Sequence, residues 1–131
     1  MRIMMNIALI ADANDLARSF VSHVLKSVQL DVIETRSEEE AWNVFQSRRD
    51  EIAYVFTDIR LAQGSGTSLY RRIRDSSESK VVVLSGANPG VDTGGIENDS
   101  FGMTLHQPFT VEEIIQSTQL IEDPYRLAQA Q

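Results

Sequence analysis

The chain has 131 residues, of which 42% are hydrophobic and 24% charged, the composition of a single globular domain. Its formal net charge is −7 and no cluster of Lys or Arg interrupts the acidic balance, which argues against direct nucleic-acid binding. The absence of cysteine excludes disulfides and thiolate chemistry. The apolar run at residues 7–11 is too short for a signal peptide or a membrane span, so we expect a cytoplasmic protein without membrane partners.

Strand-like and helix-like segments alternate from the amino terminus. Residues 6–11 form a continuous apolar run, typical of a strand covered on both faces. Apolar side chains then recur at helical spacing, and we expect one buried helix face made of Leu16, Ala17, Phe20, Val21, Val24, Leu25 and Val28. Asp15 is the predicted N-cap of this helix, and Asn14 is expected to be a solvated loop residue. His23 is expected at the helix surface.

A second strand and helix follow, and then a third strand. Residues 31–35 predict the second strand, and Ser37 and Glu40 have the spacing of a capping box at the start of the next helix. The side chains of that helix expected to pack inward are Ala41, Trp42, Val44 and Phe45. Residues 52–57 predict the third strand, which leads directly to Asp58.

The next part of the chain is a loop with glycines, followed by a helix with several arginines. A loop with Gly64 and Gly66 leads to a helix whose basic side chains are expected to be solvated: Arg71, Arg72 and Arg74. Residues 81–84 predict the fourth strand. Residues 87–100 contain several glycines and no helical period, so we expect a loop there, or at most one turn of helix.

The last predicted unit is a strand followed by a helix. Residues 101–105 predict the fifth strand, and Thr110 and Glu113 have the spacing of a second capping box. The inward side of that helix is expected to carry Val111, Ile114, Ile115 and Thr118. Residues 1–121 are therefore predicted to form one domain, and residues 122–131 a polar C-terminal tail.

Strict alternation of strands and helices predicts an α/β fold, a doubly wound five-stranded parallel sheet with helices on both faces. Functional groups in such folds gather at the carboxyl ends of the strands. The candidates there are Asp12, Asp58, Ser85 and the segment 107–109. Asp12 and Asp58 also have a structural interpretation as helix N-caps, and Ser85 as a turn residue. We favour the site interpretation because Asp15 is the better cap for its helix and because residues 64–65 separate Asp58 from the next helix.

Four segments, in order, resemble the signatures of response regulator receiver domains of two-component signal transduction. They are Leu9-Ile10-Ala11-Asp12, Thr57-Asp58-Ile59-Arg60-Leu61 followed by Gly66, Val82-Val83-Leu84-Ser85-Gly86, and Gln107-Pro108-Phe109. The resemblance covers residues 6–121 and implies the flavodoxin-like receiver fold.

The resemblance also implies a role for each of these residues. Asp58 would accept a phosphoryl group from a histidine kinase or phosphotransfer protein, and Ser85 and Gln107 would contact that group. A Mg²⁺ ion would be held by Asp12, Asp58 and the backbone carbonyl of Arg60. Beyond self-phosphorylation and autodephosphorylation at Asp58, no enzymatic activity is implied.

Three departures from the receiver pattern stand out. The second of two adjacent acids after the first strand is Ala13, and the lysine before Pro-Phe is Gln107, which carries no charge. Both changes predict weak Mg²⁺ binding and a slower or less stable phosphoryl adduct. The aromatic residue commonly found three places before the lysine is Thr104, so no aromatic side chain can switch there.

Two function hypotheses follow. In the first, the chain is a stand-alone receiver that is phosphorylated on Asp58 and signals by contacts with a downstream protein, because no output domain follows residue 121. In the second, it is a pseudo-receiver, a protein-binding module that works without phosphorylation. Ala13 and Gln107 favour the second hypothesis, whereas Asp12, Asp58 and Ser85 favour the first.

Overall fold

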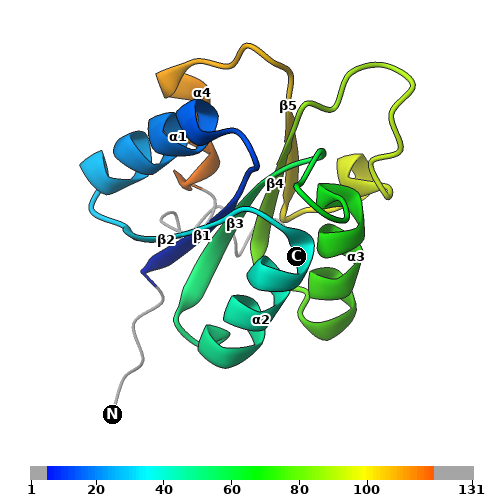
Figure 1. Ribbon diagram of the computed structural model, residues 1–131, viewed down its shortest axis with the longest axis horizontal. Helices are drawn as coiled ribbons and strands as arrows, with labels where there is room; N and C mark the ends of the chain where they lie inside the picture. Colours follow the sequence, from blue (N-terminus) through cyan, green and yellow to red (C-terminus); the bar gives the residue numbers. More distant parts are fainter. Residues whose placement is uncertain (1–5, 120–131) are drawn as a thin grey trace.

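The computed structural model describes residues 6–119, and the tail predicted for residues 122–131 lies outside them. Five parallel strands form one sheet in the order β2-β1-β3-β4-β5 (Figure 1). The strands are β1 (Ile7–Ala11), β2 (Asp31–Thr35), β3 (Ile52–Asp58), β4 (Val81–Ser85) and β5 (Gly102–Leu105). The predicted strands are confirmed to within about two residues at each end.

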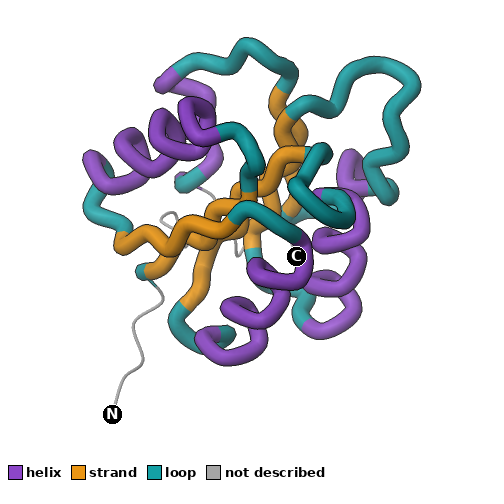
Figure 2. Tube along the Cα trace, viewed as in Figure 1, coloured by secondary structure: helices purple, strands orange, loops and turns teal. Residues whose placement is uncertain are grey.

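Helices cover both faces of the sheet (Figures 1 and 2). They are α1 (Asp15–Ser27), α2 (Glu38–Arg48), α3 (Gly66–Ser76) and α4 (Val111–Ser117), with one 3₁₀ turn, η1 (Ile96–Asn98). Helices α1 and α4 contact each other on one face, and α2 and α3 contact each other on the opposite face. The predicted doubly wound fold is therefore confirmed. Within residues 6–119, no helix is long and apolar enough to cross a bilayer.

The core consists of two apolar layers separated by the sheet. Because successive strand side chains point to opposite faces, β1 contributes Leu9 to one layer and Ala8 and Ile10 to the other. The first layer packs under α2 and α3 and the second under α1 and α4. Every residue of β1 and β4 is buried, as expected of strands covered on both faces.

The first turns of α1 and α4 correct two sequence predictions. Leu16 is 85% exposed, Phe20 40% and Val111 39%, although all three were expected to face inward. At about 100° per residue, Leu16 lies roughly a third of a turn away from the buried Val21, Val24 and Leu25, so it points away from the sheet. The N-cap of α1 is Asn14, whose side chain accepts from the Ala17 N–H at 3.0 Å. Asp15, predicted to be the cap, is the first helical residue.

The two predicted capping boxes differ in the structure. Thr110 and Glu113 form a complete reciprocal box at the start of α4, as predicted. Ser37 caps α2 by accepting from the Glu40 N–H, but the Glu40 carboxylate accepts from the N–H of Arg36 at 2.8 Å. In a complete box this carboxylate would accept from the N–H of Ser37, so here its bond is made one residue earlier in the chain.

The arginines of α3 are paired rather than simply solvated, which corrects the prediction of a solvated face. Arg72 bonds to the carboxylates of Glu38 and Glu39 at 3.1 and 2.7 Å and lies over the ring of Trp42. Trp42 stacks on the Phe45 ring, so its predicted packing role is confirmed. The partners of Arg72 are more than thirty residues away in sequence, beyond the reach of helix-face reasoning.

The segment between β4 and β5 contains only the short turn η1, as its glycines predicted. Ile96 in that turn is fully buried and anchors it to the layer under α2 and α3. Asp99 accepts from the Tyr70 hydroxyl at 2.7 Å and from Arg74 Nε at 2.5 Å. The segment therefore lacks an α-helix yet is attached to α3 by polar contacts.

Candidate functional site

The carboxyl ends of four strands bring the predicted site residues together at one edge of the sheet. Asp12 directly follows β1, and Asp58 is the last residue of β3. Ser85 ends β4 and is the register partner of Asp58 across the β3–β4 ladder. Gln107 follows β5 and reaches the same carboxylate from the other side of β4. Neither aspartate caps a helix, since Asn14 caps α1 and Ser65 caps α3.

Asp12 is buried and held through its backbone and its side chain. Its N–H donates to the Thr35 carbonyl at 3.0 Å, and its Oδ1 accepts from the Asn14 N–H at 2.8 Å. Burial raises the pKa of Asp12 above the usual carboxyl range, and the charge of Asp58 adds to that rise. The Asn14 N–H and the charge of Arg18 oppose it. A cation placed between the two carboxylates would relieve the repulsion.

Both carboxylate oxygens of Asp58 have a hydrogen-bond donor. Oδ1 accepts from the Arg60 N–H at 2.9 Å, and Oδ2 accepts from the Gln107 side-chain amide at 3.4 Å. Gly86 lies beside it with a φ of 81°, and a Cβ on that glycine would come within 3.3 Å of Asp58 Oδ1. A larger residue at position 86 would be strained and would narrow the space around this carboxylate.

Asp58 faces a groove between the first turn of α1 and the loop after β5. The groove has a volume of about 480 Å³ and is lined by Asn14, Ala17, Phe20, Asp58, Gln107, Pro108 and Phe109. A much smaller cavity, about 10 Å³, is lined by Asp12, Asp58 and Ser85 among others. It has room for about one water molecule. The Asp58 carboxylate is thus reachable from outside through a partly apolar opening.

The loop from β3 to α3 is held by Glu38, a residue that the sequence analysis did not single out. Its buried carboxylate accepts from the Ser65 N–H at 3.1 Å, the Ser68 hydroxyl at 2.8 Å and Arg72 at 3.1 Å. Burial acts to raise the pKa of Glu38, but these donors outweigh it and lower the pKa. The loop that carries Arg60 is therefore tied to the start of α2.

These elements bring the carboxylates of Asp12 and Asp58 together at one edge of the sheet. The carboxylates of Asp12 and Asp58 and the carbonyl of Arg60 are the ligand types that Mg²⁺ prefers, with water filling the remaining positions. Across residues 6–119, no group of three or more His, Cys, Asp or Glu side chains is placed to hold a metal ion. The site fits a magnesium ion that keeps several waters, with fewer carboxylates than a dedicated metal cage.

A family model described as the response regulator receiver domain matches residues 8–119 of the chain. The chain belongs to this family. Receiver domains act in two-component signalling, where they interact with histidine kinases or phosphotransfer proteins, and they generally bind Mg²⁺ at the acidic pocket. No curated protein matches the sequence.

Solved receiver structures share the fold at low sequence identity. The signal receiver domain of an HD domain-containing protein from Pseudomonas fluorescens Pf-5 is 18% identical, with a TM-score of 0.79, covering 99% of this chain and 95% of that chain. The chemotaxis response regulator CheY4 of Vibrio cholerae is 19% identical, with a TM-score of 0.74 and coverage of 88% and 98%. A response regulator receiver domain protein from Clostridium thermocellum is 18% identical, with a TM-score of 0.76 and coverage of 88% and 94%.

The departures from the receiver pattern lie at the site itself. Ala13 leaves Asp12 as the acid after β1, and Gln107 brings a neutral amide to Asp58. Thr104 is half-buried in β5, opposite Leu84 of β4. His23 is exposed, as predicted, and His106 is exposed as well. This receiver therefore has less charge on both sides of the Asp58 carboxylate than the family pattern provides.

Proposed function

We propose that Asp58 is the phosphoryl acceptor of this receiver, supplied by a histidine kinase or phosphotransfer protein and read by a downstream protein. The observation that carries the proposal is the position of Asp58 at the end of the central strand. There it faces an open groove, with Asp12 and Ser85 beside it and the Gln107 amide 3.4 Å from Oδ2.

The chemistry is a transfer between two nucleophiles. A carboxylate oxygen of Asp58 forms a bond to phosphorus while the phosphorus–nitrogen bond of a phosphohistidine breaks, and the electron pair goes to the imidazole nitrogen. The Arg60 N–H on Oδ1 fixes the carboxylate, which holds it at the opening of the groove. Asp12, Asp58 and the carbonyl of Arg60 would hold a Mg²⁺ ion, which would supply positive charge for the phosphoryl oxygens.

Two further side chains would contact the phosphoryl group. Ser85 is buried at the end of β4 in register with Asp58, so its hydroxyl is available as a donor on the β4 side. Gln107 is exposed and donates from the β5 side. A neutral amide stabilises a developing phosphoryl charge less than an ammonium does, so we expect a short-lived adduct.

A second candidate function is supported by the same departures. With Ala13 in place of an acid and Gln107 in place of a cation, the domain would be a pseudo-receiver that binds a protein without being phosphorylated. The pairing of Asp12, Asp58 and Ser85 at one edge favours phosphorylation over this alternative.

The experiment that separates the two functions is incubation with acetyl phosphate and Mg²⁺ followed by intact-mass measurement. We expect a gain of one phosphoryl group in the wild type, none in Asp58→Asn, and a normal gain in Asp75→Asn. Asp75 is an exposed carboxylate on α3, so its variant makes the same chemical change away from the site. A wild type that stays unmodified at saturating Mg²⁺ would favour the pseudo-receiver.

A further inference from the structure

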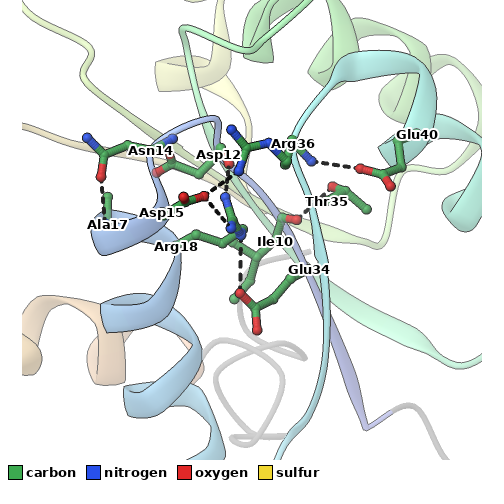
Figure 3. Close-up of polar contacts among 10 residues, drawn as sticks. All are labelled: Ile10, Asp12, Asn14, Asp15, Ala17, Arg18, Glu34, Thr35, Arg36 and Glu40. Atoms are coloured by element: carbon green, nitrogen blue, oxygen red, sulfur yellow. Dashed lines mark hydrogen bonds and ion pairs between the residues drawn. The ribbon is translucent and has the colours of Figure 1, made fainter.

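Arg18 reaches from α1 into the loop that carries Asp12. Its Nη1 donates to the backbone carbonyl of Asp12 at 2.9 Å, and its Nη2 donates to Asp15 at 2.7 Å. Its Nε donates to Glu34 on β2 at 3.2 Å. Figure 3 shows this guanidinium among all three partners, and its side chain is only 14% exposed. Each guanidinium nitrogen is thus bonded.

The Asp12 residue is consequently fixed at three points. Its N–H is held by Thr35 on β2, its Oδ1 by the Asn14 N–H, and its carbonyl by Arg18. The first bond extends the β1–β2 ladder by one residue, and the second is local to the loop. Asn14 caps the end of α1, whereas the Arg18 bond joins the helix to the Asp12 carbonyl itself, at the peptide that leaves Asp12.

The two carboxylates on Arg18 are partly or mostly solvated, at 71% exposed for Asp15 and 38% for Glu34. Ion pairs of this kind contribute little to stability. Together with the Asp12 carbonyl they give every guanidinium nitrogen an acceptor, which fixes the orientation of this planar group. Arg36 bonds to the same Asp15 carboxylate and completes the network (Figure 3).

We propose that Arg18 is a positioning residue for Asp12: it holds the Asp12 peptide so that the carboxylate faces Asp58. This positioning role rests on the proposed function. If Asp58 accepts a phosphoryl group, the site must gather positive charge around it, and this requires the Asp12 carboxylate to be held in place. Ala13 makes the role more important here, since Asp12 has no neighbouring acid to share the metal.

The test compares amide hydrogen exchange at Asn14 in the wild type, Arg18→Ala, Arg18→Lys and Arg36→Ala. The Asn14 N–H donates to the Asp12 carboxylate, so its exchange reports the orientation of Asp12 with or without metal. We expect Arg18→Ala to accelerate it about tenfold, because a hydrogen bond from a charged donor is lost. Arg18→Lys should be intermediate, since an ammonium cannot make all three contacts.

Arg36→Ala is the matched control. It removes the same charge and the same kind of bond to Asp15, and among the described residues the Arg36 guanidinium has no bond to Asp12. Exchange at Asn14 should stay within about twofold of the wild type in this variant, since an exposed ion pair contributes little. The Val24 amide, in the buried part of α1, should be unchanged in every variant.

The second readout is Mg²⁺ affinity, measured by calorimetric titration. Arg18→Ala should weaken this affinity about fivefold, because a misplaced Asp12 carboxylate should cost about as much as one hydrogen bond. Unchanged Asn14 exchange in Arg18→Ala overturns the positioning role. So does equal acceleration at Asn14 and Val24, which would mean general loosening of α1, or an equal effect of Arg36→Ala. A wild type that is not phosphorylated refutes the proposed function instead, and the exchange result still decides the role of Arg18.

Discussion

A Cβ atom on Gly66 would lie 2.2 Å from the backbone oxygen of Asp58 and 3.0 Å from the Thr57 hydroxyl oxygen. The Gly66 N–H also donates to the Ile59 carbonyl at 2.9 Å. The first residue of α3 is therefore packed directly against the peptide that positions the candidate phospho-acceptor. Only glycine allows this approach, because the obstructing atom belongs to the backbone and cannot rotate away.

Gly66→Ala should destabilise the fold by about 1–3 kcal/mol, the usual cost of forcing extra volume into a packed region. It should also slow phosphorylation, because the Asp58 backbone must shift to admit the methyl group. Chemical unfolding and intact-mass time courses measure the two effects. Gly90→Ala is the control: no atom lies within 4 Å of its Cβ, so only the strain of its positive φ should be seen. Equal losses in the two variants would contradict the steric explanation.

Ala13→Asp should strengthen Mg²⁺ binding by about tenfold. The added carboxylate lies next to Asp12 at the end of β1, and each further anionic oxygen favours a hard divalent cation. Without Mg²⁺ the same variant should be less stable than the wild type, because three carboxylates then repel one another. Calorimetric titration and thermal unfolding with and without Mg²⁺ check both parts. Tight wild-type binding that the substitution leaves unchanged would refute this account of the site.

Asp12→Asn should raise the free energy of unfolding at pH 7 and abolish the stabilisation by Mg²⁺. The buried Asp12 has a raised pKa, so the folded state holds its proton more tightly than the unfolded chain does. The wild type therefore loses stability relative to Asp12→Asn as the pH rises. The loss begins in the ordinary carboxyl range and is complete above the folded pKa of Asp12. Well below pH 4, at about pH 3 and lower, the two proteins should be alike, since Asp12 is then mostly protonated in both states. Unfolding curves across this range measure the difference, and a constant gap would contradict it.

Asp99→Asn should cost about 2 kcal/mol, because it leaves the mostly buried Arg74 without its charged partner. Burial acts to raise the pKa of Asp99, but the Phe101 N–H, the Tyr70 hydroxyl and Arg74 outweigh it and lower the pKa. The stability that Asp99 contributes is thus present above the ordinary carboxyl pKa and lost as the pH falls through its folded value.

Hydrogen exchange and chemical unfolding measure this effect, with faster exchange expected over residues 99–102 in the variant. Asp92→Asn is the control, since the Arg71–Asp92 pair is solvated and should contribute much less than the buried Arg74–Asp99 pair. Exchange across residues 91–98 is expected to be fast already in the wild type, because few of these amides lie in regular structure. Strong protection there would contradict that expectation.

Sequence patterns predicted the helices correctly but not which residues of each helix lie over the sheet. Leu16, Phe20 and Val24 recur at every fourth position, but four residues cover about 400° and not one full turn, so Leu16 and Phe20 lie around the axis from the buried Val21, Val24 and Leu25. Phe20 instead lies 6.1 Å from the Phe109 ring, across the groove above Asp58. A four-residue repeat therefore indicates a helix without fixing which side of that helix is buried.

The sequence alone determined the strand–helix alternation and, with it, the gathering of Asp12, Asp58, Ser85 and Gln107. Each follows or ends an apolar run, and parallel strands joined by right-handed crossovers must end at one edge of the sheet. Only the tertiary structure decided how that edge is held. Glu38 reaches Ser65 across 27 positions, and Arg18 reaches the Asp12 carbonyl while bonded to Glu34 on another element. Such contacts depend on the lengths of side chains and the distances between packed elements, which no local pattern contains.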